Sequence, residues 1–281
     1  MIDTKDTPMP EHVELQVEGR GVRLEYARIL AADDGAPLIV FLHEGLGSLS
    51  MWGDWPQRLC RATNTRGLVF SRYGYGHSTP RPTGNWPSDY LELEARVMLP
   101  ALFAALDIQP EKEKVILFGH SDGGTIALLH SAMFPHTLAA TIVLAPHEFV
   151  EEVGTQRIKT LQQGFNGSSL ARMLKEHHAD PTGVFRGWSE LWVADRYRDW
   201  NIEHWLSRIT CPLMVAQGAQ DQYGTLEQVH AVTRAVPHAE SVILENCRHI
   251  PHQEQPEALL NHVRRFLSLH ELVDLLAASD S

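Results

Sequence analysis

The chain has 281 residues, 43% of them hydrophobic, and it carries a formal net charge of −11. This length is enough for one large α/β domain with an insertion, or for two smaller domains. The acidic balance, with no cluster of Lys and Arg, argues against a nucleic-acid partner, because a phosphate backbone is bound by basic side chains.

The N-terminal residues contain no apolar signal segment, and no stretch approaches the run of about 18 apolar residues that a membrane helix needs. We therefore expect a cytoplasmic protein with no membrane partner. Cys60, Cys211 and Cys247 have neither disulfide nor metal-ligand spacing, so they are expected to be buried free thiols. The sequence does not indicate an oligomeric state.

The first third of the chain alternates strand-like and helix-like segments. Residues 13–17 and 22–30 have alternating hydrophobicity with glycines between them, which predicts an opening β-hairpin. Residues 38–42 form a continuous apolar run, typical of a strand buried on both faces, and a Gly-rich loop follows at 43–48. The remaining expected elements are a helix over 50–60, a strand over 67–70 and a helix over 88–106.

The segment 114–124, which reads KVILFGHSDGG, carries the clearest motif. Its apolar first half predicts a buried strand, and residues 125–134 predict a buried helix. Between them, Gly119, Ser121 and Gly123 form G-x-S-x-G. Glycines at this spacing fit a strained turn, where side chains two residues to either side of the serine would collide with neighbouring backbone. Such a turn exposes the serine hydroxyl at a helix N-terminus.

The alternation of strands and helices is interrupted once after this motif. A strand is expected over 139–144, but residues 149–205 hold several helix-like pieces and no convincing buried strand. We therefore predict a core domain of residues 1–148 and 206–281, with a helical cap inserted at 149–205. The expected elements after the cap are strands over 212–217 and 241–244, helices over 225–235 and 256–267, and an apolar helical tail over 269–278.

The order of five motifs, HEGLG, SRYGYG, GHSDGG, QGAQDQYG and CRHIPHQEQPE, resembles the α/β-hydrolase superfamily across nearly the whole chain. The resemblance implies a mostly parallel sheet with helices on both faces and a helical cap. In that family the catalytic triad follows the chain order nucleophile, acid, histidine. The matching positions are Ser121, Asp221 and His249, each of which comes after an expected strand.

These three residue types form a chemical unit. A serine hydroxyl is a weak nucleophile at neutral pH, and a histidine within hydrogen-bond reach removes its proton during attack. Asp221 would orient the ring of His249 and stabilise its charged form. The family stabilises the oxyanion with backbone N–H groups, and the resemblance places these at Asp122 and Gly45. We expect no cofactor and no metal.

Other assignments compete with these. His252 could replace His249 as the base, although its setting before a predicted helix favours His249. Asp195 or Asp199 could be the acid, although both lie among arginines that indicate a solvated helix face. The pair His177-His178 lacks a completing carboxylate motif for a metal site, so surface histidines are expected. The place of the Asp122 carboxylate in the first turn of a helix, where the dipole favours negative charge, is sufficient to explain it, with a substrate contact as the alternative.

Three further residues are candidates for substrate contact: Glu44, Trp188 and Trp192. The family's loop more usually reads H-G-x-x-G, and here Glu44 occupies the first glycine position. We expect its carboxylate to point outward and brace the loop, with an inward carboxylate neutralised by Arg72 or by protonation as the alternative. His43 is expected to brace the same loop. Trp188 and Trp192 lie four residues apart, so they either line a pocket under a lid or dock the cap on the core.

These features predict a serine hydrolase that cleaves a small to medium carboxylic ester, with a small-molecule acyl compound as its substrate. A serine at the centre of the G-x-S-x-G turn disfavours the dehalogenase and epoxide hydrolase reactions of the superfamily, which use an aspartate at this position. Thioester, lactone, amide and carbon–carbon bond cleavage stay open as alternatives. So does a different class, a ligand receptor, lyase or cofactor-free oxygenase on the same fold.

Overall fold

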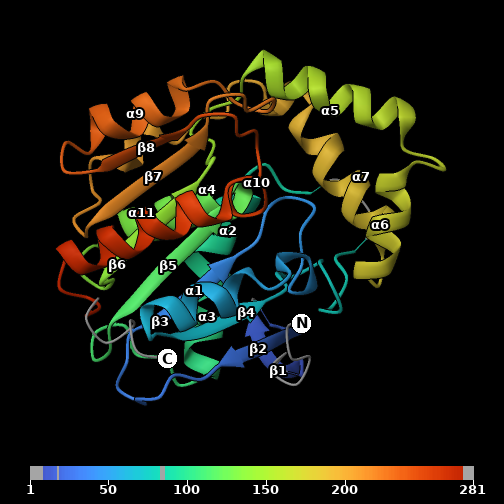
Figure 1. Ribbon diagram of the computed structural model, residues 1–281. Coiled ribbons are helices and arrows are strands. Elements are labelled where there is room, and N and C mark those ends of the chain that lie inside the picture. The colour runs from blue at the N-terminus through green and yellow to red at the C-terminus, as the bar shows by residue number, and fades with distance from the viewer. Residues whose placement is uncertain (1–8, 18, 83–85, 275–281) are drawn as a thin grey trace.

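A computed structural model describes residues 9–17, 19–82 and 86–274 (Figure 1). Within them an eight-stranded sheet runs through the centre of the molecule. Its strands are β1 (Glu11–Val17), β2 (Arg20–Ile29), β3 (Leu38–Leu42), β4 (Arg66–Phe70), β5 (Val115–His120), β6 (Ala140–Leu144), β7 (Leu213–Gly218) and β8 (Glu240–Leu244).

The strands lie in the order β1-β2-β4-β3-β5-β6-β7-β8. The pairs β1–β2 and β2–β4 are antiparallel, and all other neighbours are parallel. This arrangement confirms the predicted fold class and the opening hairpin. Because the parallel strands end at one edge of the sheet, the loops that follow β3, β5, β7 and β8 meet there.

Helices cover both faces of the sheet. One apolar core lies between the sheet and helices α1 (Trp55–Thr63) and α11 (Pro256–Leu269). The other core lies under α2 (Tyr90–Leu93), α3 (Leu99–Ala105), α4 (Asp122–Met133) and α9 (Glu227–Ala235). Helix α4 is buried on nearly all sides, as its uniformly apolar sequence predicted. The three cysteines are buried free thiols.

Two predicted helices are interrupted. The helix expected over 88–106 consists of α2, a π-helical turn over Glu94–Met98, and α3. Pro100 lies at the start of α3 and cannot donate a backbone hydrogen bond to the preceding turn, which accounts for the break in the α-helical pattern. The helix expected over 50–60 begins as a 3-10 turn at Ser50–Trp52 and continues as α1 after Gly53, which has a φ of 61°.

The C-terminal tail differs from the expectation where it can be described. Helix α11 extends to Leu269, and residues 270–274 form turns rather than the start of a further helix. The rest of the expected tail helix, residues 275–278, lies outside the described residues.

Four α-helices lie between β6 and β7 in the chain: α5 (Glu152–Gly164), α6 (Ser169–His177), α7 (Pro181–Trp192) and α8 (Glu203–Leu206). Figure 1 shows α5, α6 and α7 grouped beyond one end of the sheet. No helix in the described ranges is both long and apolar enough to span a membrane.

Candidate active site

Ser121 lies between β5 and α4 in a strained backbone conformation, with φ 53° and ψ −120°. The tight turn explains the two glycines of the motif. A Cβ atom on Gly119 would lie 2.2 Å from the carbonyl oxygen of Gly123, and one on Gly123 would lie 2.0 Å from the carbonyl oxygen of Leu42. Any side chain at either position would therefore displace backbone.

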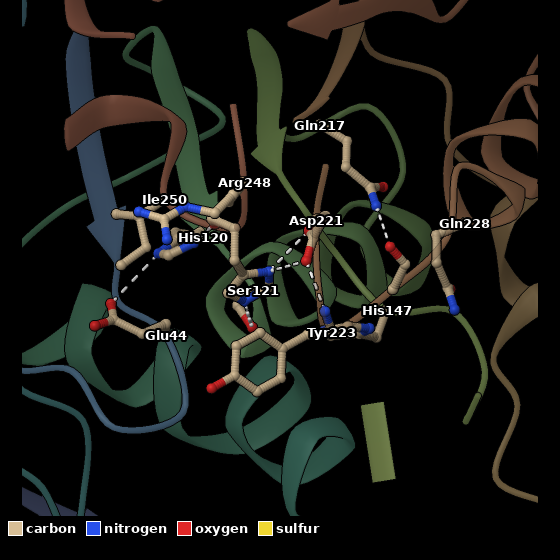
Figure 2. Close-up of polar contacts among 12 residues, drawn as sticks. Glu44, His120, Ser121, His147, Gln217, Asp221, Tyr223, Gln228, Arg248 and Ile250 are labelled. Carbon is tan, nitrogen blue, oxygen red and sulfur yellow. Dashed lines mark hydrogen bonds and ion pairs between the residues drawn. The ribbon is translucent and has the colours of Figure 1, made fainter. Parts of the chain in front are cut away.

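Ser121, His249 and Asp221 form a continuous chain of hydrogen bonds. His249 Nε2 lies 3.0 Å from Ser121 Oγ, and His249 Nδ1 lies 2.9 and 2.8 Å from the two carboxylate oxygens of Asp221. The backbone N–H of Tyr223 donates to Asp221 Oδ1 over 2.8 Å. Figure 2 shows Ser121, Asp221 and Tyr223 gathered at this point. The structure thus brings together the three residues named from the sequence.

The loops that carry Asp221 and His249 touch each other. Gly218 ends β7, and a Cβ atom there would lie 2.2 Å from the carbonyl oxygen of Arg248. The glycine of the Q-G-x-x-D turn therefore allows the two loops to approach. Burial alone would raise the pKa of Asp221, but the charge and hydrogen bonds of His249, with the Tyr223 N–H, lower it. Asp221 is therefore held as a carboxylate.

The competing acid and base lie elsewhere. His252 belongs to the short helix α10 (Pro251–Glu254), and its ring packs 4.8 Å from that of Trp52. Burial lowers the pKa of His252 to about 3, and the charge of His120 adds to this effect. Asp195 pairs with Arg198 on the surface, where both side chains are exposed.

A cavity of about 230 Å³ adjoins Ser121. Ser121 and His249 lie on one side of it. The segment between β6 and β7 supplies the opposite side: Thr155 and Ile158 of α5, Leu170 and Met173 of α6, and Trp188 and Trp192 of α7.

Glu44 is one of the residues that line this cavity, and its carboxylate folds back over its own loop. Its carboxylate lies over Gly47, where a Cβ atom would be 2.5 Å from Glu44 Oε2, and the same oxygen lies 3.5 Å from His120 Nδ1. Arg72 does not neutralise it. The Arg72 guanidinium donates instead to the backbone oxygen of Glu44 over 3.0 Å and lies 3.8 Å from the Asp122 carboxylate.

The carboxylate of Asp122 is buried and has protein partners. Tyr90 donates its hydroxyl hydrogen to Asp122 Oδ2, and Trp188 adds a side-chain hydrogen bond. Burial raises the pKa of Asp122, an effect that the nearby Arg72 charge opposes. A Cβ atom on Gly45 would lie 2.1 Å from Trp188 Nε1, so this glycine makes room for the indole. Asp122 and Gly45 both line the cavity.

Two other histidines hold the loop after β3. His43 is fully buried; Nδ1–H donates to the Glu44 carbonyl over 2.7 Å, and Nε2 accepts from the Arg72 N–H over 3.0 Å. His178 is buried too, which corrects the expectation of a surface residue. Its Nδ1 accepts from the Gly76 N–H, and its Nε2–H donates to the carbonyl of Leu46. Thus the end of α6 is tied to the loop that carries Glu44.

The sequence analysis missed three residues around the triad. The Tyr223 ring lies 4.6 Å from that of His249, and the His147 ring stacks on His249 at 5.8 Å. Burial, aided by the charge of His249, lowers the pKa of His147 to about 3. His120 contacts the loop of His249 from β5. The sequence held a signal for each of them: Tyr223 lies two residues after Asp221, His147 follows the strand β6, and His120 directly precedes Ser121.

The chain is similar in sequence and fold to known proteins. A human protein named serine hydrolase BPHL is 30% identical over 161 residues, which cover 53% of this chain and 50% of that protein, so the match spans half the relative's length. The crystal structure of VinJ has a TM-score of 0.74 at 23% identity and covers 94% of this chain and 99% of its own. The structure of a thermophilic esterase from Thermogutta terrifontis has a TM-score of 0.71 at 18% identity, and the match covers 92% of this chain and 99% of that one.

A family model covers most of the chain. Residues 39–262 match the family model described as the alpha/beta hydrolase family. The chain therefore belongs to that family.

Proposed function

We propose that this protein is a serine hydrolase that cleaves a small to medium carboxylic ester through an acyl-enzyme. The observation that carries the proposal is the hydrogen-bonded chain from Ser121 Oγ through His249 to Asp221 beside a cavity. A histidine that accepts from the serine and donates to a carboxylate is the arrangement needed to activate the hydroxyl.

The proposed reaction has two halves. Ser121 Oγ attacks the ester carbonyl while His249 Nε2 takes its proton, and the backbone N–H groups of Asp122 and Gly45 stabilise the oxyanion. His249 then gives the proton to the leaving alcohol, and the acyl group stays on Ser121. Water attacks this ester with His249 again as base, which releases the acid and restores the serine. Asp221 holds the ring and balances its charge in both halves.

The cavity supports a small substrate. Its volume of about 230 Å³ lies below the range of roughly 300 to 1,000 Å³ usual for drug-sized ligands. Residues 149–205 act in this proposal as a cap that shapes the pocket, since α5, α6 and α7 all contribute lining side chains. An ester substrate is consistent with the name of the Thermogutta terrifontis structure, which is that of an esterase.

A fluorophosphonate probe tests the nucleophile. It should label the wild-type protein at Ser121 and leave Ser121→Ala unlabelled. Absence of labelling in folded wild-type protein would favour a non-hydrolytic receptor or lyase. The bond type is tested by turnover of p-nitrophenyl esters of graded acyl length beside acyl-CoA thioesters, lactones and amides. Faster turnover of any of the last three than of every ester would overturn the ester assignment.

A further inference from the structure

His120 directly precedes Ser121, and the proposed reaction does not use it. It ends β5 and is fully buried. Its Nε2 lies 2.7 Å from the backbone carbonyl oxygen of His249, so Nε2–H donates to that oxygen. The residue beside the nucleophile is thereby linked to the backbone of the residue whose ring contacts the nucleophile.

The other nitrogen of the same ring faces a carboxylate. His120 Nδ1 lies 3.5 Å from Glu44 Oε2 and has no closer polar partner among the described residues. Figure 2 shows Glu44 facing His120 across this gap. Burial alone would raise the pKa of Glu44, but the nearby His120 ring lowers it well below its usual range. The ring therefore lies between a carbonyl from one loop and an ionised carboxylate from another.

The remaining surroundings of the ring are aromatic. His249 lies 5.2 Å away between ring centroids, His252 lies 5.1 Å away, and Trp52 lies 6.4 Å away. His252 has its pKa lowered to about 3 by burial, so it is uncharged near neutral pH. Within the described residues, Glu44 is the carboxylate that pairs with this ring.

The hydrogen bond to the His249 carbonyl fixes the orientation of the His120 ring. A flipped ring would turn a carbon toward that oxygen and lose the hydrogen bond. The orientation of His120 then fixes the backbone of His249. This matters because a displacement of about 1 Å of a reacting group can lower a rate about 100-fold.

We propose that His120 is a positioning residue for the general base: held in orientation by Glu44, it fixes the backbone of His249, whose ring contacts Ser121 and Asp221. This inference rests on the proposed function, since it assigns His249 the role of base. His120, the residue between the first glycine and the serine of G-x-S-x-G, would thus have a role in catalysis through His249.

The test compares two variants that differ in one hydrogen-bond donor. His120→Gln keeps an N–H near the position of Nε2, and His120→Met has nearly the same shape without it. With p-nitrophenyl butyrate we expect His120→Met to lose about 10- to 100-fold in kcat with little change in KM. His120→Gln should recover most of that loss. Rates are expressed per site labelled by fluorophosphonate, so that unfolded protein is not counted.

Glu44 is tested by a double-mutant cycle. Glu44→Ala should lower kcat about fivefold in the wild-type background and have no further effect in the His120→Met background, because the carboxylate acts through the ring. An equal loss in both backgrounds would overturn the role given to Glu44.

Three outcomes remain distinct. If the wild-type protein neither labels nor turns over esters, the proposed function fails. If it does both and His120→Met keeps the wild-type kcat, only the positioning role fails. If His120→Met and His120→Gln lose kcat equally, or lose only thermal stability, the ring serves packing and the inference is wrong.

Discussion

The two sides of the cavity are held in place by different means. On the sheet side, Ser121, Asp221 and His249 follow strand ends, and backbone contacts at glycines such as Gly218 set their positions. On the other side, side-chain packing between segments far apart in the sequence decides the geometry, as where the Trp188 indole takes the space that a side chain at residue 45 would occupy. Where backbone turns set the geometry, a side chain can be truncated without moving its neighbours. Where side-chain packing sets it, truncation changes the shape of the cavity.

The largest effects are expected on the sheet side. Ser121→Ala and His249→Ala should abolish turnover without unfolding the protein, because backbone turns place both side chains. Asp221→Asn should lower kcat about 10⁴-fold, since an amide favours the wrong tautomer of the ring. Steady-state kinetics with circular dichroism as a folding check would measure this. An Asp221→Asn enzyme within tenfold of the parent would contradict the acid assignment.

The next effect concerns stability on the same side. The pKa of His252 is lowered to about 3 by burial, against an ordinary value of 6.5. Between these values the unfolded chain binds a proton that the folded chain does not, so stability falls as the pH drops below about 6.5. His252→Gln should reduce this fall by up to about 1.4 kcal/mol per pH unit. Urea unfolding at pH 7.5, 6 and 5 measures it, and parallel pH curves for the two proteins would contradict the assignment.

A smaller effect is expected on the side of the cavity that α5, α6 and α7 line. Trp188→Ala and Trp192→Ala should raise KM increasingly with acyl length, to about tenfold for the longest acyl group that wild type accepts, because both indoles line the cavity. Trp205→Ala is the matched control, since Trp205 is half-buried in the core rim and does not line the cavity. If KM stays unchanged across acyl lengths in the first two variants, these tryptophans only dock the cap.

The same contrast explains what could be predicted from the sequence. Buried strands and the G-x-S-x-G turn have a period and spacing that a sequence displays directly, so most strands and Ser121 could be predicted from them, and the resemblance to the family added Asp221 and His249. The break before Pro100 and the contact of Glu44 with His120 could not be predicted, because each depends on neighbours that only the folded chain supplies. For Glu44 the decisive neighbour is His120, and for His178 it is the loop after β3.

The smallest effect expected is on substrate charge. Glu44 is ionised and lines the cavity, and neither Lys nor Arg lines it among the described residues. An anionic acyl group should therefore be disfavoured relative to a neutral one of the same shape. Monoethyl succinate and ethyl succinamate form such a pair. Glu44→Gln should raise the ratio of their kcat/KM values, anionic over neutral, about fivefold at low salt, where screening is weakest.

Using a ratio separates this charge effect from the positioning role of Glu44, because any loss in kcat that acts through His120 is common to both esters and cancels. Glu151→Gln is the control, since Glu151 also lines the cavity but its carboxylate already accepts hydrogen bonds from Thr225 and Gln228. Its effect on the ratio should be smaller than that of Glu44→Gln. A ratio that Glu44→Gln leaves unchanged would mean that the carboxylate is screened from the substrate by His120, and Glu44 would then act only through the loop of His249.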